Sequence, residues 1–368
     1  MTVRVSGRVV TPAGVLPEGC VEIRDSMITA VAEYPTARTG HWVLPGFVDM
    51  HTHGGGGHTF TTGDPAQARG AAEFHLGHGT TSLLASLVSA PFELMRDATA
   101  AFAPLVADGV VDGLHFEGPY LSQRRCGAQN PAHLRDASLD ELGELIALGG
   151  GAVRMVTLAP ERPGALAAIE MLTANGVVAA IGHSDAGYEQ TLAAVEAGAT
   201  VATHLFNAMP AVHHREPGPV LALLASPGVI CELIADGVHL HDGTLTFATA
   251  VAGPDRCALI TDAMAAAGMS DGAYELGGQA VTVTDGVARL TDSGAIAGST
   301  LTLDAALRRA VAAGIDIVDA ALMVATTPAR AIRLSGRGAL VPGYRADLVV
   351  LDEELNVVKV MRAGTWVS

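Results

Sequence analysis

Five residues with metal-binding side chains each follow a short apolar segment of this sequence. They are His51, His53, Glu117, His183 and His204. Alternate residues of a strand point to the same side, so His51 and His53 can converge on one cation. Five ligands are too many for a single four-coordinate ion that keeps an open position. We therefore predict two divalent cations per chain, with Glu117 bridging them, His51 and His53 on one, and His183 and His204 on the other.

This mixture of imidazole and carboxylate ligands suits Zn²⁺ best, and Fe²⁺, Mn²⁺ and Co²⁺ remain open. An isolated His-X-His pair has a simpler interpretation, two hydrogen-bonded histidines in a glycine-rich turn. The three further candidates each follow a different apolar segment, which favours a metal site.

Asp262 follows another apolar segment, 257–261, and is the candidate for proton transfer. Its carboxylate could take a proton from a metal-held water that attacks a carbonyl, and return that proton to a leaving amine. The alternative is that Asp262 only caps the next helix. Its place among the other polar segment ends favours catalysis, so the set predicts amide hydrolysis by a metal-bound hydroxide.

The apolar segments that precede these residues alternate with Ala- and Leu-rich stretches long enough for helices. Such alternation indicates parallel strands, and eight strand and helix units can close into a ring whose carboxyl ends carry the active site. We therefore expect an α/β fold, a (β/α)₈ TIM barrel. The expected strands are 47–50, 81–88, 111–115, 153–158, 177–181, 201–203, 229–234 and 257–261, and the expected helices include 64–77, 138–148, 164–174 and 188–197.

The two ends of the chain carry further β segments, at 3–10 and 20–32 and at 346–351 and 357–361. Such short segments are too small to fold alone, so we expect the N- and C-terminal parts to pair into one small β-sandwich domain. The predicted division is 1–45 and 335–368 for this domain and 46–334 for the barrel. A β-hairpin insertion is expected near 273–292, where apolar and polar residues alternate.

Length and charge limit the classes of function. The 368 residues suffice for one barrel and a smaller unit, and the net charge of −16 disfavours nucleic acid or an anionic membrane as partner. We find no apolar stretch of the roughly 20 residues that a membrane span needs, and the first ten residues do not resemble a secretory signal. Four widely spaced cysteines fit a reducing compartment, so we expect a cytoplasmic protein.

Several longer motifs resemble a known family. The strings 45–53 and 342–352 resemble the amidohydrolase superfamily, and 115–120, 182–186, 203–209, 215–218 and 261–264 look like the N-acetylglucosamine-6-phosphate deacetylases within it. The likeness covers essentially the whole chain. It implies that Glu117, His183 and His204 bind the metal common to the family, that His51 and His53 place the chain in a two-metal subgroup, and that Asp262 is the general base and acid.

The resemblance also implies a substrate site. Arg215 would bind the phosphate, either within one chain or across a homodimer interface, because an anionic group in so acidic a protein needs a dedicated guanidinium. The alternative is that the run His213 to Arg215 is only an exposed basic loop. The other implied substrate-binding residues are Ala128, Gln129, Asn207, Ala208, His239, Ile296, Ala297 and Gly298.

Gln129 departs from the family pattern, which has histidine at this place to hydrogen-bond the carbonyl that is cleaved. Glutamine keeps an amide donor but cannot become cationic. We therefore predict that substrate binding is retained and that turnover is lower than in a Gln129→His variant. Asp49 and Asp236 are expected to orient their neighbours rather than to act on substrate.

The leading hypothesis is a metal-dependent enzyme that hydrolyses N-acetylglucosamine 6-phosphate to glucosamine 6-phosphate and acetate. One alternative is another barrel amidohydrolase, acting on a cyclic amide or an N-acyl amino acid, which Arg215 and Asn207 argue against. A second is a catalytically silent barrel that serves as a binding module, which the full set of metal ligands argues against. The expected partners are a small amino-sugar phosphate and a second copy of the chain.

Overall fold

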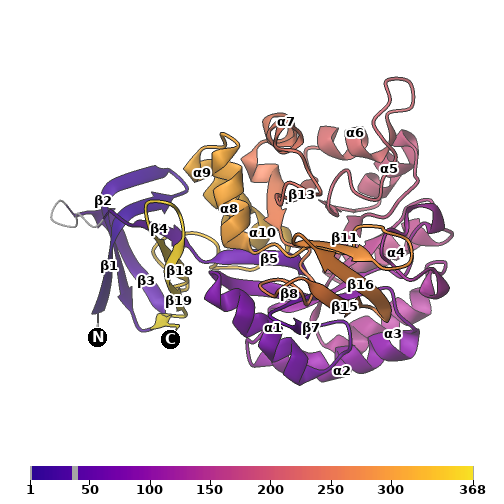
Figure 1. Ribbon diagram of the computed structural model, residues 1–368, viewed down its shortest axis with the longest axis horizontal. Helices are drawn as coiled ribbons and strands as arrows, with labels where there is room; N and C mark the ends of the chain where they lie inside the picture. The colour runs from indigo at the N-terminus through magenta and orange to yellow at the C-terminus, as the bar shows by residue number, and fades with distance from the viewer. Residues whose placement is uncertain (1, 35–39, 368) are drawn as a thin grey trace.

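The computed structural model describes residues 2–34 and 40–367, and within those ranges eight parallel strands form a barrel (Figure 1). The strands are β5 (Phe47–Thr52), β8 (Thr80–Val88), β9 (Gly113–Glu117), β10 (Val153–Leu158), β11 (Val178–Ile181), β12 (Val201–Ala202), β13 (Ile230–Ile234) and β14 (Cys257–Ile260). The first and last strands meet where the Asp262 backbone N–H donates to the His51 carbonyl over 2.9 Å. The predicted barrel is confirmed, with strand ends within two residues of those expected.

The strands of the barrel are buried along almost their whole length, because helices cover their outer faces and side chains fill the interior. The helices are α1 (Pro65–Gly77), α2 (Phe92–Ala107), α3 (Leu139–Gly149), α4 (Ala165–Ala174), α5 (Tyr188–Glu196), α6 (Gly218–Ala225), α7 (Asp242–Ala252), α8 (Leu303–Ala312), α9 (Ile317–Ala321) and α10 (Thr327–Ala331). Asp64 and Ser138 accept backbone N–H groups at the starts of α1 and α3, which fixes where these helices begin.

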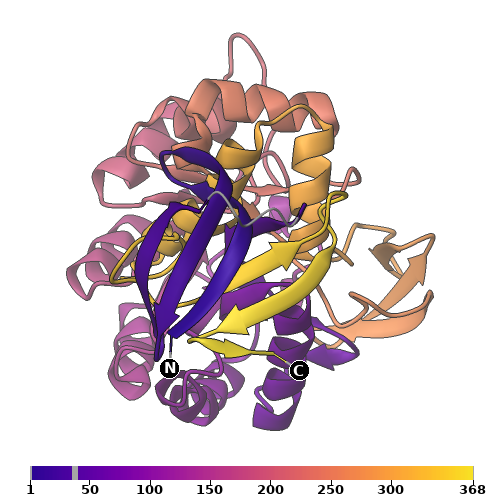
Figure 2. The same cartoon turned by 90° about the vertical axis from the view of Figure 1, so that its left-hand side faces the viewer.

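The terminal segments form a second sheet beside the barrel, which faces the viewer in the foreground of Figure 2. Over the described ranges it contains β20 (Thr365–Trp366), β19 (Val357–Arg362), β18 (Leu348–Leu351), β4 (Trp42–Pro45), β1 (Thr2–Thr11), β2 (Gly14–Arg24) and β3 (Met27–Glu33), hydrogen-bonded in that order. The sheet curls so that strands from both ends of the chain share one apolar core, which includes Val9, Val21, Leu348 and Met361. This is the small β domain expected from the sequence.

The N-terminal part of this domain differs in detail from the prediction. The segment expected as one β stretch at 20–32 is two strands, because Asp25 adopts a left-handed conformation and turns the chain between β2 and β3. β2 begins at Gly14, six residues before the segment expected at 20–32. We propose domain boundaries near residues 45 and 335; residues 1 and 368, at the ends of the predicted ranges, lie outside the described residues.

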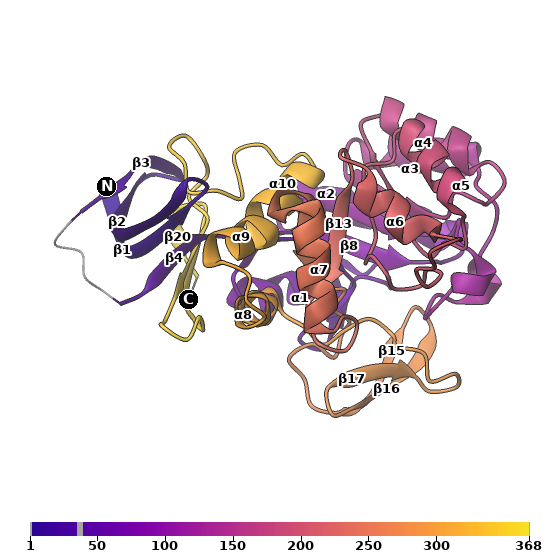
Figure 3. The same cartoon turned by 90° about the horizontal axis from the view of Figure 1, so that it is seen from above.

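The segment expected as a hairpin forms three antiparallel strands in the stretch from 272 to 290. These are β15 (Gly272–Leu276), β16 (Gln279–Thr284) and β17 (Val287–Leu290). Figure 3 shows this sheet standing to one side of the barrel, and its inner face packs on Val88 and Met264. It therefore borders the end of the barrel that carries the polar residues. A further strand pair, β6 (Gly54–Gly55) and β7 (His58–Thr59), follows His53.

Candidate active site

Six polar side chains converge at the carboxyl ends of the barrel strands: His51, His53, Glu117, His183, His204 and Asp262. All six are buried. His183, His204 and Asp262 have positive φ angles of 47°, 29° and 50°, a conformation that costs energy for residues other than glycine. Packing in the surrounding barrel maintains this backbone conformation at each of the three residues, whose side chains point inward. The sequence-based grouping of these residues at one rim is therefore found in the structure.

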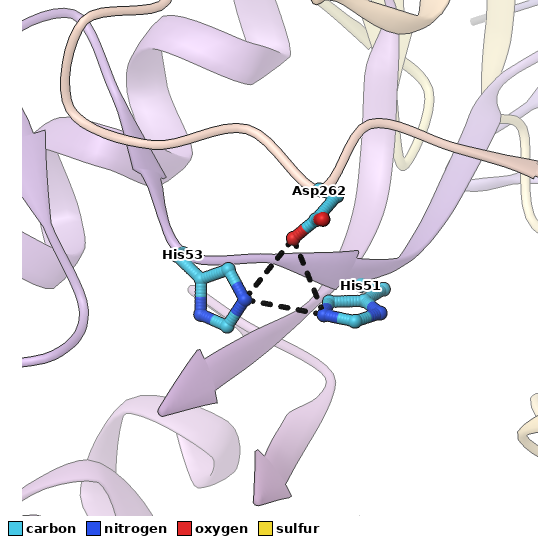
Figure 4. Close-up of side chains that lie close together, drawn as sticks. All are labelled: His51, His53 and Asp262. Carbon is cyan, nitrogen blue, oxygen red and sulfur yellow. Dashed lines mark hydrogen bonds and ion pairs between the residues drawn. The ribbon is translucent and has the colours of Figure 1, made fainter. Parts of the chain in front are cut away.

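His51, His53 and Asp262 form the first group, with their polar atoms pointing toward one another (Figure 4). The Nε2 atoms of the two histidines are 3.1 Å apart. Asp262 Oδ1 lies 3.4 Å from His51 Nε2 and 3.2 Å from His53 Nε2. This separation suits three ligands around one small cation.

Glu117, His183 and His204 form the second group. Glu117 Oε1 lies 2.9 Å from His183 Nε2 and 3.0 Å from His204 Nε2, and the two Nε2 atoms are 3.1 Å apart. The other oxygen, Oε2, is 3.1 Å from His53 Nε2 in the first group. Glu117 therefore stands between the two groups, which is the geometry expected of a bridging carboxylate.

The hydrogen bonds on the far side of the imidazole rings show that these residues fit a cation. His51 Nδ1 faces a carboxylate oxygen of Glu232, while the Nδ1 atoms of His53 and His183 face the carbonyl oxygens of Ser86 and Arg125. Each of these oxygens can only accept, so each Nδ1 carries hydrogen and a neutral ring presents an Nε2 lone pair. Lone pairs of His51 and His53 then face each other at 3.1 Å, an arrangement that a cation between them would stabilise.

The pKa shifts of these histidines and carboxylates indicate that positive charge between them is favourable. Burial lowers the pKa of His53, but Asp262 and Glu117 outweigh burial and raise it to about 9. Burial raises the pKa of Glu117, but His51 and His183 outweigh it, so the net shift is downward. The carboxylates thus require either protons on the rings or cations among them, and a bound divalent cation would displace those protons.

A cavity of about 240 Å³ opens above the two groups. Seven of the nine residues that the sequence suggests for substrate contact line it: Ala128, Gln129, Asn207, Ala208, His239, Ile296 and Gly298. Ala297 does not line it, because its side chain is buried in the core under the β15 to β17 sheet. Val88, Leu276 and Ala295, which sequence reasoning missed, add an apolar wall.

Arg215 is not among the cavity-lining residues of the described chain. It lies on an exposed loop, 211–216, and borders a separate surface depression with Arg125 and Asp185. Its guanidinium Nη1 is 2.7 Å from His214 Nε2. Within one chain, therefore, this arginine is not beside the two metal-binding groups.

Gln129 uses its amide group inside the site. Its Nε2 donates to Glu117 Oε2 over 2.6 Å, and its Oε1 accepts from the Ser89 backbone N–H over 2.7 Å. The side chain is only 4% exposed. Gln129 thus holds the carboxylate that stands between the two groups, a contact that the sequence did not predict.

Asp236 and Asp49 make the orienting contacts expected of them. Asp236 Oδ2 accepts from His239 Nδ1 over 2.7 Å, which directs the other ring nitrogen of His239 away from Asp236. Asp49 Oδ2 accepts from the Thr261 hydroxyl over 2.6 Å, and burial raises the pKa of Asp49 to about 7. This contact fixes the strand end that precedes Asp262.

Two features of the site were not predicted from the sequence. Glu232, in the middle of β13, is fully buried against His51. A charged residue within an apolar strand was the signal that could have identified it. The second feature is the contact between the three-stranded sheet and the loop that carries Gln129, where Gln279 donates to the Ala128 carbonyl over 2.5 Å. This contact depends on tertiary packing and has no sequence pattern.

Comparison with known proteins places this geometry among related enzymes. The amidohydrolase family model matches residues 42–367. N-acetylglucosamine-6-phosphate deacetylase of Lysinibacillus sphaericus is 36% identical over 356 residues, which are 94% of this chain and 92% of that protein. N-acetylgalactosamine-6-phosphate deacetylase of Escherichia coli O157:H7 is 38% identical over 370 residues, 98% of each chain.

One solved structure is similar throughout. It is an aspartate-to-alanine mutant of N-acetyl-D-glucosamine-6-phosphate deacetylase from Mycobacterium smegmatis, in complex with N-acetyl-D-glucosamine-6-phosphate. It is 46% identical, has a TM-score of 0.96 and covers 99% of both chains. The family resemblance expected from the motifs is therefore confirmed.

Proposed function

The chain belongs to the amidohydrolase family, and on that basis we propose that it hydrolyses N-acetylglucosamine 6-phosphate to glucosamine 6-phosphate and acetate. The observation that carries this proposal is the pair of ligand groups that share Glu117 at the floor of the cavity. Amide hydrolysis needs a polarised carbonyl, an activated water and a proton for the leaving nitrogen. The residues at the cavity floor can support all three requirements.

The donor set supports two divalent cations per chain, one held by His51, His53 and Asp262 and the other by His183 and His204, with Glu117 between them. Zn²⁺ suits these ligands best, with Fe²⁺, Mn²⁺ and Co²⁺ as alternatives. Bound there, such cations supply Lewis acidity that polarises the amide carbonyl and makes water more acidic.

Asp262 is the proposed proton carrier. Its carboxylate lines the cavity and is otherwise buried, and burial raises its pKa while His51 and His53 outweigh burial and lower it. The positive charge of bound cations would lower it in the same way once the rings are neutral, so Asp262 would be ionised and able to accept a proton from the attacking water. The same carboxyl group then donates that proton to the amino-sugar nitrogen as the C–N bond breaks.

The sugar would lie between His239, Asn207 and the apolar wall of the cavity. Asp236 takes the Nδ1 hydrogen of His239, so His239 presents its other nitrogen as a hydrogen-bond partner. Val88 and Leu276 exclude water from one side of the cavity. A pocket with an apolar wall and few polar partners is typical of small-molecule sites.

The phosphate requires a cation from elsewhere, since no Arg or Lys lines the cavity in the part of the chain that the structure describes. We assign this role to Arg215, supplied by the partner subunit of a homodimer. Val212, on the same loop, and Phe247, on α7, are 48% and 51% exposed and border one apolar depression. Apolar surface beside the loop supports burial against a second copy.

N-acetylgalactosamine 6-phosphate is a second candidate substrate, because relatives of similar identity carry either sugar in their names. The two sugars differ in the orientation of the hydroxyl at C4, away from the amide that is cleaved. Both therefore fit the same chemistry at the metal groups. Selectivity would depend on the part of the cavity that contacts C4.

We also propose that the enzyme works in the cytoplasm. Cys20, Cys231 and Cys257 are buried thiols, and the four cysteines form no disulfide in the described chain. A reducing compartment accommodates such thiols. Among the described helices, none has the length and apolar character required to traverse a bilayer.

Acetate release tests the proposal. Four compounds would be compared: the two N-acetyl amino sugars, each with and without 6-phosphate, with the metal content of the same protein sample measured in parallel. We expect acetate from the phosphorylated sugars, with the gluco form preferred. A preference for unphosphorylated sugars, or no acetate from a metal-loaded sample, would contradict the proposal.

A further inference from the structure

Glu232 places a carboxylate in the interior of the barrel, beneath the candidate metal groups. It lies on β13 between Cys231 and Leu233, and its exposed fraction is 0%. Removing a carboxylate from water is costly unless other groups compensate for the lost hydration. The buried charge of Glu232 must therefore be compensated by groups outside β13.

One oxygen of Glu232 makes both contacts. Oε2 lies 3.0 Å from His51 Nδ1 and 3.1 Å from the backbone nitrogen of His204, both of which donate to it. The other oxygen, Oε1, is buried and has no hydrogen-bond partner among the residues that the structure describes. The carboxylate thus joins a ligand of the first metal-binding group to the backbone of a ligand in the second.

The four imidazoles differ in what lies behind them. His53 and His183 donate from Nδ1 to backbone carbonyls, and the Nδ1 atom of His204 has no partner within the described ranges. His51 alone, in that same set, donates to a carboxylate. A negative charge behind a ligating imidazole makes its other nitrogen a stronger donor and holds the ring in one tautomer.

We infer that Glu232 is a positioning residue that strengthens the cation site formed by His51, His53 and Asp262, and leaves the His183 and His204 site largely unaffected. This inference rests on the proposed two-cation function. It assigns the difference between the two sites to charge: in the first group a carboxylate lies behind His51, whereas in the second group His183 has a backbone carbonyl behind it. Asp262 would contact the cation directly, whereas Glu232 would act through His51.

A purely structural role for Glu232 predicts a different outcome. In that case the carboxylate only ties β13 to the end of β12 through the His204 backbone. Glutamine can replace it with both hydrogen bonds intact, because its single carbonyl oxygen can take the place of Oε2 and its NH₂ group the place of the unpartnered Oε1. Glu232→Gln therefore removes the charge and retains the tie between the strands.

The test is cation binding to metal-free protein, measured by titration with Zn²⁺ alone at fixed pH and ionic strength. We expect wild-type protein to bind two ions, and Glu232→Gln to bind one of them about 10- to 100-fold more weakly. Asp347→Asn is the matched control, since Asp347 is another buried carboxylate but lies in the small β domain, bonded to Arg345. It should bind both ions as the wild type does.

Repeating the Glu232→Gln change in two variants that each lack one metal ligand shows which cation site it weakens. With His183→Asn, which leaves the first group as the complete one, Glu232→Gln should still weaken binding about 10- to 100-fold. With His53→Asn the same change should have little effect. Glu232→Asp keeps the charge but draws it back from His51 by one methylene, so it should weaken the first site less than Glu232→Gln does, and it provides a second variant if the glutamine protein is poorly folded.

Unchanged affinity in Glu232→Gln, or a loss confined to the His183 and His204 site, would overturn the inference and leave the proposed function intact. Wild-type protein that binds no divalent cation would overturn both.

Discussion

Asp262→Asn tests the proposed proton transfer with little change in shape. Asparagine has nearly the same volume as aspartate, but its side chain cannot accept a proton near neutral pH. The surrounding contacts are well defined, since Asp262 Oδ1 lies 3.2 Å from His53 Nε2 and 3.4 Å from His51 Nε2. The amide oxygen of asparagine can occupy the position of Oδ1 and keep those distances.

The expected loss follows from what Asp262 does. A positioned general acid or base contributes about 10²- to 10⁴-fold to rate, which is about 3 to 5 kcal/mol on the barrier. Because the cavity and its other lining residues are unchanged, KM should change little, and the loss should appear in kcat. A fall in kcat with constant KM indicates an interaction made only in the transition state.

The assay is acetate release under steady-state conditions, with cation content measured on each sample. Asp262 belongs to a ligand group, so the rates should be compared at equal metal occupancy. Isothermal titration with N-acetylglucosamine 6-phosphate would show whether binding survives. Retention of more than about one tenth of the wild-type kcat in fully loaded Asp262→Asn protein would refute the assignment.

Three other predictions concern different parts of the molecule. Gln129→His should raise kcat by about 10²-fold with little change in KM, because a cationic donor can face the developing oxyanion, and equal rates would refute this. Arg215→Ala and Asp262→Asn proteins should each be nearly inactive alone. If Arg215 acts across the dimer, subunit exchange between the two proteins should restore about a quarter of the wild-type activity. No recovery of activity would mean that Arg215 serves the site of its own chain. Burial raises the pKa of Asp304, but hydrogen bonds from His78 and Thr302 and the charge of Arg308 outweigh it and lower the pKa to about 2. Its carboxylate therefore stabilises the fold above the unfolded pKa of about 4, and Asp304→Asn should lower the free energy of unfolding by about 2 kcal/mol at pH 7. Urea unfolding of both proteins should show this difference becoming smaller as the pH falls from about 4 toward 2.

The barrel could be predicted from sequence because its strands are short apolar runs with abrupt polar ends. The strand at 153–158 was predicted with the same bounds that β10 has in the structure. The second strand of the small β domain was not, because Val15 and Leu16 pair across a tight turn with Val10 and Val9. Which residues pair depends on the register of the two strands, and the composition of residues 11–19 gave no indication of that register.

The candidate ligands could be predicted because each one lies at or just beyond the carboxyl end of a strand, where side chains of a parallel barrel meet. Glu232 could not be placed in the same way, since it lies within β13 and its role depends on which strands are neighbours. The contact of Gln129 with Glu117 was also missed, because the two residues approach only after the loop folds over the barrel. Sequence thus located the ligand groups and the supporting Asp49 and Asp236, and missed the contacts of Glu232 and Gln129, which depend on tertiary packing.

Metal content measured by mass spectrometry on protein that has been purified without chelator gives the decisive result for this account. The geometry of the two ligand groups around Glu117 predicts close to two divalent ions per chain, one of them lost on His53→Asn substitution and the other on His183→Asn substitution. A correctly folded wild-type protein that holds no divalent ion, even after dialysis against Zn²⁺, would contradict it.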